Sequence, residues 1–161
     1  MLRTTLTSLA FALPLLLLAA PAVAADDAEA KAPAEKLLTA GEKLFIAKDA
    51  KGLAATYTDD AVITSLSRDN NSRAIKTQTY IGRETIEKTY VDLFKGDATL
   101  HAKNTIKHVY RIAPDVLAIA GEFTPDTQAS DPAKVPFVQV RVKQGDAWKI
   151  ASMQLLLLLD K

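Results

Sequence analysis

The order of secondary-structure signals constrains the fold of this chain more than any single motif does. Apolar residues recur at helical spacing over 35–48 and again over 50–57, and a β-rich run covers 61–66. Gly82 then opens a third helical stretch that reaches Phe94, and the rest of the chain reads as strands. Three helices and a strand followed by an antiparallel meander predict an α+β domain.

Turn signals divide the second half of the chain into four expected strands. They cover residues 100–112, 116–124, 135–143 and 148–159. Two polar stretches without a period, 67–77 and 125–134, are expected to be loops, the first of them mobile. If the sheet curves and the helices pack on its concave face, a conical cavity remains between the two layers, and ligands bind in the mouth of such a cavity.

The first 24 residues predict an export signal. Arg3 supplies a positive charge, an apolar run follows, and Ala22-Val23-Ala24 offers the small residues that a signal peptidase recognises, with cleavage after Ala25 as the alternative. The apolar run is short for a membrane span of ~20 residues, so we expect no span after cleavage. We expect a flexible tether over 25–34 and a folded domain over 35–161, in the periplasm or secreted.

Composition excludes several kinds of site. The chain has no Cys, which rules out thiol catalysis, thiolate metal sites and disulfide support. Its two His residues, His101 and His108, are too few for a His-rich zinc site, and we expect neither a metal nor a cofactor. The 20 basic and 19 acidic residues nearly balance, so the chain lacks the charge that nucleic-acid binding requires.

Three short motifs resemble a known superfamily. They are Asp59-Asp60-Ala61 after the paired helices, Gly82-x-x-x-Ile86 at the start of the third helix, and Trp148-x-Ile150 in the last strand. Residues 35–159 thereby resemble the SnoaL-like, nuclear-transport-factor-like superfamily, which includes ketosteroid isomerase, scytalone dehydratase and polyketide cyclases. The resemblance implies a cystatin-like cone: three N-terminal helices packed on the concave face of a curved, mostly antiparallel sheet.

The resemblance also allows a test for catalysis. Ketosteroid isomerase uses a carboxylate base, with a Tyr and a protonated Asp as its oxyanion hole. We aligned Asp49 and Asp59-Asp60-Ala61, without gaps, with the equivalent segment of ketosteroid isomerase. The position of that enzyme's base then falls on Ser65, and the position of its oxyanion-hole Tyr falls on Gly41. A serine without an adjacent base cannot remove a carbon-bound proton at neutral pH. The isomerase residues are therefore missing at two of three positions, and differing loops leave the third unplaced.

Candidate ligand-binding residues come from the inward helical faces and from the strands. They are Tyr57, Tyr90, Phe94, Tyr110, Glu122, Gln139, Arg141 and Gln154. Glu122 and Arg141 could pair beneath the cavity on neighbouring strands, or strand alternation could place either on the solvent face. Gln154 stands where several relatives carry a pocket His, which favours binding over proton transfer, although it could equally satisfy a neighbouring strand.

Three functions follow from these features. The first is an exported domain that binds a small, partly apolar molecule in an apolar conical pocket without turning it over. The second is a lyase or isomerase that uses Glu122 or His108 as general base, with Arg141 or Gln154 polarising the substrate. The third is an interaction module that forms a homodimer through the five leucines of 155–159, unless the chain's own helices cover that strand.

Overall fold

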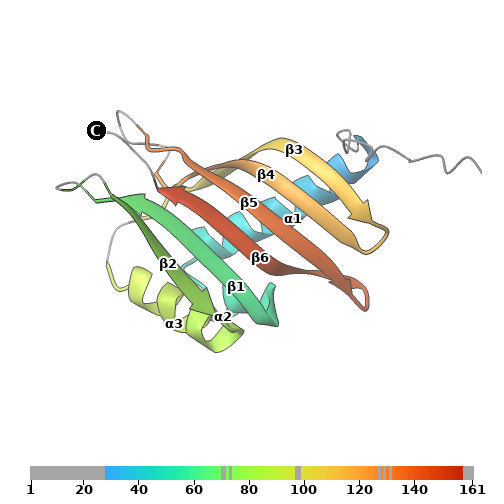
Figure 1. Ribbon diagram of the computed structural model, residues 1–161, viewed down its shortest axis with the longest axis horizontal. Helices are drawn as coiled ribbons and strands as arrows, with labels where there is room; N and C mark the ends of the chain where they lie inside the picture. The colour runs from blue at the N-terminus through green and yellow to red at the C-terminus, as the bar shows by residue number, and fades with distance from the viewer. Residues whose placement is uncertain are drawn as a thin grey trace, which may run out of the picture.

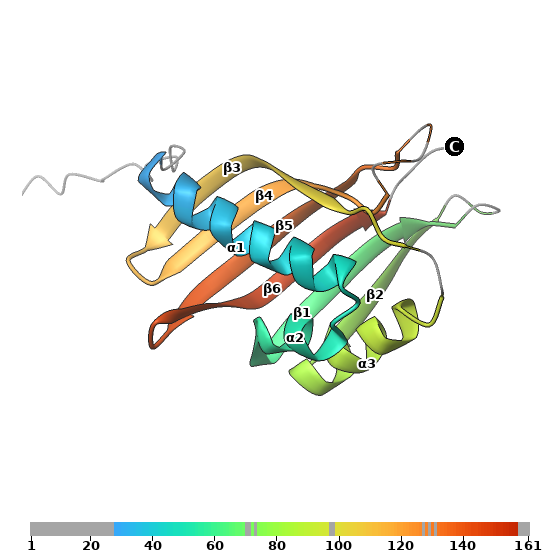
Figure 2. The same ribbon diagram turned by 180° about the vertical axis from the view of Figure 1, so that it is seen from behind.

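Three helices lie on one face of a six-stranded sheet in the part of the chain that the structure describes (Figures 1 and 2). This computed structural model describes residues 28–69, 72, 74–96, 99–126, 128, 130 and 132–157. The helices are α1 (Ala28–Ile46), α2 (Ala50–Ala55) and α3 (Arg83–Leu93). The strands are β1 (Tyr57–Arg68), β2 (Ile75–Ile81), β3 (Lys103–Ala113), β4 (Val116–Thr124), β5 (Val135–Gln144) and β6 (Ala147–Leu157). The predicted α+β class, with helices on the concave face of a curved sheet, is confirmed.

The strands are arranged in the order β2-β1-β6-β5-β4-β3. β1 and β6 run parallel, and the other neighbouring pairs run antiparallel. Register shifts interrupt the β1–β6, β3–β4 and β5–β6 pairings. Such bulges increase the local twist of a sheet, which explains how six strands curve around the helices.

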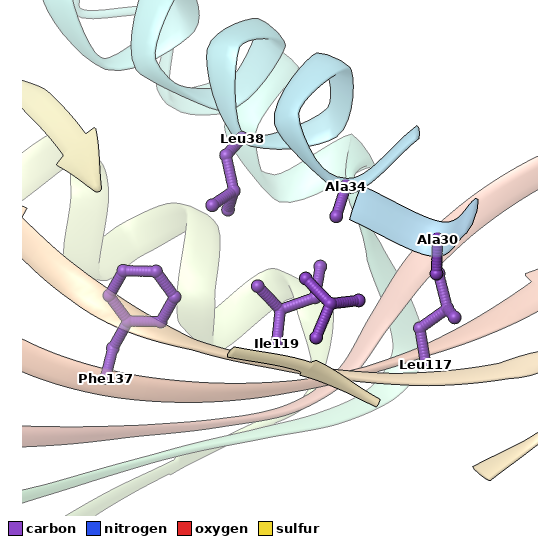
Figure 3. Packing of buried hydrophobic residues seen from close by; sticks show 7 residues of the cluster. Ala30, Ala34, Leu38, Leu117, Ile119 and Phe137 are labelled. Carbon is purple, nitrogen blue, oxygen red and sulfur yellow. The ribbon is translucent and has the colours of Figure 1, made fainter. Parts of the chain in front are cut away.

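α1 packs on the sheet through small side chains spaced four residues apart. Ala30, Ala34 and Leu38 are buried and lie above Leu117 and Ile119 of β4 (Figure 3). Residues spaced in this way share one helical face, and alanine lets the helix approach the sheet closely. The first helix is therefore fixed over one half of the sheet, and the space beside Leu38 is open for a cavity.

The flexible tether expected over 25–34 is wrong for residues 28–34, which are part of α1. Pro33 lies inside the helix, where its missing N–H removes one hydrogen bond near the helix start. Ala30 and Ala34, on either side of Pro33, are buried against the sheet, which favours the helix over this stretch. The predicted export signal and residues 25–27 lie outside the described residues. None of the helices in the described part of the chain is long and apolar enough to cross a membrane.

The loop expected over 67–77 is too long at both ends, because β1 continues to Arg68 and β2 begins at Ile75. β2 is an edge strand, and Tyr80 is its one half-buried side chain. A strand of this kind has no apolar alternation to reveal it. The second helix also ends earlier than expected, at Ala55, and Tyr57 opens β1 instead of closing the helix.

The corner between β2 and α3 holds the start of β1 in place. Gly82 has a φ of 85°, which glycine adopts without strain, and its N–H donates to the Ala61 carbonyl at 2.8 Å. Arg83 Nη2 and Nε donate to the Tyr57 carbonyl at 2.7 and 3.2 Å, and Nη1 pairs with Asp59 at 2.8 Å. These bonds fix the backbone of Tyr57, whose side chain points to the cavity.

Candidate functional site

A cavity of about 370 Å³ lies between the three helices and the concave face of the sheet. Its lining comes mainly from apolar side chains of both layers. They include Leu38, Phe45, Leu53, Leu93, Phe123, Val135, Phe137, Ile150, Met153, Leu155 and Leu157. A lining of this kind favours an apolar molecule, and the few polar groups among it would determine how that molecule is oriented.

A continuous series of aromatic rings runs along one side of the cavity. Phe123 of β4 meets Phe45 of α1 edge to face at 5.0 Å between ring centroids, and Phe45 meets Phe94 at 5.2 Å. Phe94 stacks on Tyr90 of α3 at 5.9 Å, and Tyr90 lies 6.4 Å from Tyr57. These contacts lock the rings against one another, so the wall is largely preformed.

Two tyrosines end this aromatic series in a hydrogen bond. The hydroxyls of Tyr57 and Tyr90 lie 2.8 Å apart, and the Tyr57 hydroxyl lies 3.9 Å from the Met153 sulfur. Burial raises the pKa of both tyrosines, so both hydroxyls keep their protons at neutral pH. Two hydroxyls share one hydrogen bond between them, which leaves the second hydrogen for the weak sulfur acceptor or for a ligand.

Arg141 places a positive charge in the cavity wall. Its side chain is only 3% exposed, and its Nε donates to the Gln139 side-chain oxygen at 3.1 Å. No carboxylate among the described residues forms an ion pair with it. Burial lowers the pKa of Arg141 to about 10, so the guanidinium remains charged at neutral pH. That shift corresponds to a folding cost of about 3 kcal/mol below pH 10.

Sheet register places Arg141 and Tyr57 in the same part of the cavity. Ile150 of β6 pairs with Tyr57 on one side and with Arg141 on the other. Two strand spacings separate the paired backbones by about 10 Å, a gap that an arginine and a tyrosine side chain can span together. The charge of Arg141 acts on Tyr57 and opposes, without overcoming, the increase in its pKa.

Glu42 is the one carboxylate of the cavity lining among the described residues. Its Oε2 accepts a hydrogen bond from the Asn104 backbone N–H at 2.8 Å, and the Asn104 amide donates to the Leu38 carbonyl at 3.4 Å. These bonds connect α1 to the start of β3. Glu42 therefore has a structural partner on the side of the cavity formed by α1 and β3.

The predicted site residues fall into two groups. Tyr57, Tyr90, Gln139 and Arg141 line the cavity, and Phe94 packs behind Tyr90. The other three, Tyr110, Glu122 and Gln154, lie on the outer face of the sheet, because each strand alternates its side chains between the two faces.

Of the two alternatives for Glu122 and Arg141, the pairing beneath the cavity is wrong, and Glu122 lies on the solvent face. Glu122 pairs with Lys107 at 3.1 Å on the outer face, whereas Arg141 faces the cavity. His108 also lies on that outer face, exposed and stacked on Tyr110 at 5.9 Å. Neither candidate base, Glu122 or His108, is therefore within reach of a molecule in the cavity.

Sequence reasoning missed Glu42 and Asn104. Glu42 follows Leu38 by four residues, so helical spacing could have placed it on the cavity side of α1. Of the leucine run, Leu155 and Leu157 line the cavity and Leu156 faces outward, as alternation requires. Residues 158–159 lie outside the described residues.

No protein-family model and no curated protein matches this chain. Solved structures do match it. An NTF-2 like protein of unknown function from Shewanella oneidensis has a TM-score of 0.61 and 15% identity, over 79% of this chain and 98% of that one. A putative scytalone dehydratase from Novosphingobium aromaticivorans has a TM-score of 0.61 and 14% identity, over 79% and 83%. A ketosteroid isomerase-like protein from Erwinia carotovora atroseptica has a TM-score of 0.57 and 21% identity, over 81% and 97%.

The fold is therefore the nuclear-transport-factor-like cone that the sequence motifs resemble. Another matching structure is a domain of unknown function with a cystatin-like fold. Identities this low establish the fold alone, because one fold supports many activities. The chemistry of this chain has to be inferred from its own cavity.

Proposed function

We propose that this chain is a binding domain that holds a small, partly apolar molecule in its cavity without turning it over. The observation that carries the proposal is the cavity itself: about 370 Å³, bounded by locked aromatic rings and aliphatic side chains, with a few polar groups among them. Pockets of this size and composition are the usual sites for small ligands.

The polar groups of the cavity support binding over proton transfer. Tyr57 and Tyr90 have raised pKa values and stay protonated, and Arg141 stays charged. Glu42, the one carboxylate of the described lining, already accepts a backbone hydrogen bond. Proton abstraction from carbon requires a free base beside the substrate, whereas this set donates hydrogen bonds.

The binding proposal can be tested by filling the cavity. Gly41 lines the cavity from α1, and a Cβ built on it meets no atom within 4 Å. Gly41→Leu should insert a side chain into the cavity and abolish binding, while Ala40→Leu adds the same side chain to an exposed position of α1. The two variants should both fold, since each remains compatible with a helix.

The measurement is thermal unfolding of wild type and both variants with a panel of small amphipathic molecules. A ligand at about 100 times its Kd stabilises the fold by about 2.7 kcal/mol. We expect shifts for wild type and Ala40→Leu and none for Gly41→Leu. A panel that stabilises no form, or that stabilises Gly41→Leu equally, contradicts the proposal.

We further propose that two copies pair through the outer face of the sheet. Apolar side chains of four strands share this face: Val62, Leu66, Ile81, Val138, Val140 and Leu156. Val138 is 41% exposed and Leu156 36%, so the middle of the face leaves apolar area in contact with water. A second copy covering this face would remove that area from water.

Export is proposed on the basis of the first 24 residues alone. The mass of the mature protein, purified from cells that produce the full chain, tests it. A loss of residues 1–24 is expected, and an intact N-terminus on the purified protein would contradict it.

A further inference from the structure

A guanidinium faces the cavity with hydrogen-bonding capacity to spare. Arg141 carries five N–H donors, and the one hydrogen bond found for it in the described part of the chain uses Nε, to Gln139. Its two terminal nitrogens, Nη1 and Nη2, thus have no protein acceptor among the described residues. A charged side chain that is only 3% exposed normally has a counter-charge.

The residues that the structure describes do not provide that counter-charge from nearby. Tyr57 is the ionisable group that interacts electrostatically with Arg141. Its pKa is raised by burial, so its hydroxyl is protonated and uncharged at neutral pH. Glu42 lines the cavity as well, but it accepts the Asn104 N–H and forms no ion pair with Arg141. Among the described residues, the positive charge of Arg141 therefore has only neutral polar neighbours, Gln139 and the tyrosine pair.

We propose that the ligand of this cavity is a monocarboxylic acid with an apolar body, and that its carboxylate binds the terminal nitrogens of Arg141. This inference rests on the binding function proposed above and names the chemical class of its ligand. A planar carboxylate matches the two parallel donors of a guanidinium. A phosphate dianion would add a second negative charge, for which the described lining has no further cation.

The tyrosine pair completes the carboxylate site. Tyr57 lies across Ile150 from Arg141, and its hydroxyl shares one hydrogen bond with Tyr90. Tyr57 donates the second hydroxyl hydrogen of the pair to the Met153 sulfur, a weak acceptor that a carboxylate oxygen would replace. The apolar body of the acid would then extend along the aromatic wall, where Phe45 and Phe123 meet.

Matched acids and alcohols separate this inference from the binding proposal. We would titrate the protein at neutral pH with octanoate and cinnamate, and with octanol and cinnamyl alcohol, by calorimetry. The alcohols keep the apolar body and lose the charge. A charge-assisted bidentate contact predicts that each acid binds wild type about tenfold or more tightly than its alcohol.

Two variants identify the residue responsible. Arg141→Met should remove the preference for acids and leave the alcohols bound, whereas Arg111→Met removes a charge from an exposed position of β3 and should keep the preference. Gln139→Glu places a carboxylate beside Arg141, so it should weaken the acids and spare the alcohols. It provides the same test if Arg141→Met fails to fold.

Each outcome has one meaning. Alcohols that bind wild type as tightly as the acids overturn the carboxylate inference and leave the binding function standing. An acid preference that survives in both Arg141→Met and Gln139→Glu overturns it too. If neither acids nor alcohols bind any form, while Gly41→Leu behaves like wild type, the binding function itself fails.

Discussion

Tyr57 and Arg141 lie on opposite sides of Ile150 in one row of the sheet, the first on a parallel neighbour and the second on an antiparallel one. Val140 pairs with Ser152, so an unbroken register would pair Arg141 with Ala151. The register shift after Val140 pairs Arg141 with Ile150 instead. A bulge thus brings the cation into the row of the buried tyrosine. The polar end of the cavity depends on that irregularity.

Replacing Arg141 and Gln139 together should stabilise the empty protein. The double variant Arg141→Met, Gln139→Leu removes a buried charge and the side chain that accepts its hydrogen bond, and we expect the free energy of unfolding to rise by about 1–4 kcal/mol at neutral pH. Urea unfolding measures it. The gain should shrink as pH rises through about 10, since the folded-state pKa of Arg141 lies below its unfolded value and wild type loses the charge there. A double variant less stable than wild type would show that the charge is compensated.

Replacing Gln139 alone should have the opposite effect. Gln139→Leu leaves the Nε of Arg141 buried without an acceptor, and we expect a loss of about 1–3 kcal/mol in the free energy of unfolding. The comparison with the double variant matters most, because the same substitution should change sign once Arg141 is also removed. Equal effects in both backgrounds would mean that the two side chains do not interact.

Alkaline pH should destabilise the fold through the tyrosine pair. The pKa values of Tyr57 and Tyr90 are raised by burial, so between 10, the ordinary value, and their folded-state values the folded protein holds more protons than the unfolded chain. Stability from this source is present below pH 10 and is lost as pH rises above it. Tyr57→Phe should make the loss less steep, and Tyr110→Phe, on the outer face, should not. Stability followed by urea unfolding from pH 8 to 11, with tyrosinate absorbance, measures it.

A single charge should separate the proposed dimer. Val138→Lys puts an ammonium group in the middle of the outer face, where the side chain is 41% exposed, and we expect a monomer by light scattering. Val91→Lys makes the same change on α3, at 49% exposure on the helical side of the molecule, and should leave the dimer intact. Wild type that is already monomeric at high concentration would end the proposal.

Much of the architecture could be predicted because its elements have strong local signals. α3 and β4 were placed within one residue, since a glycine opens the helix and turn residues bound the strand. β2 could not be predicted, because an exposed edge strand has no apolar alternation to mark it. The start of α1 could not be predicted because the sequence carries a misleading signal there: Pro33 indicates a helix break. The helix extends through it with Ala30 and Ala34 packed on the sheet, a contact that local sequence does not reveal.

The strand residues of the site could be predicted only where the alternation of side chains along the strand correctly gives the face of the sheet on which each one lies. Tyr57, Tyr90, Gln139 and Arg141 line the cavity, whereas Glu122 and Gln154 lie on the other face of the sheet. The bulge of β6 shifts parity by one residue before Gln154, and no local signal in this sequence marks it, whereas β4 pairs with β5 without a shift and plain alternation places Glu122 outward. The polar residues of a curved sheet can therefore be proposed from sequence, while their sides require the structure.

The position of β6 between β1 and β5 determines when the cavity can exist. Without β6 the sheet separates into a β2–β1 hairpin and a β5–β4–β3 meander that share no strand pairing. Tyr57 belongs to the first unit and Arg141 to the second, and they meet only when the last strand enters between them. Pairings that join distant parts of a chain form late in folding, so the cavity should be among the last features to be assembled. A chain cut before Ala147 would contain the sequence of all three helices and of the first five strands, yet we expect it to have no place for a ligand.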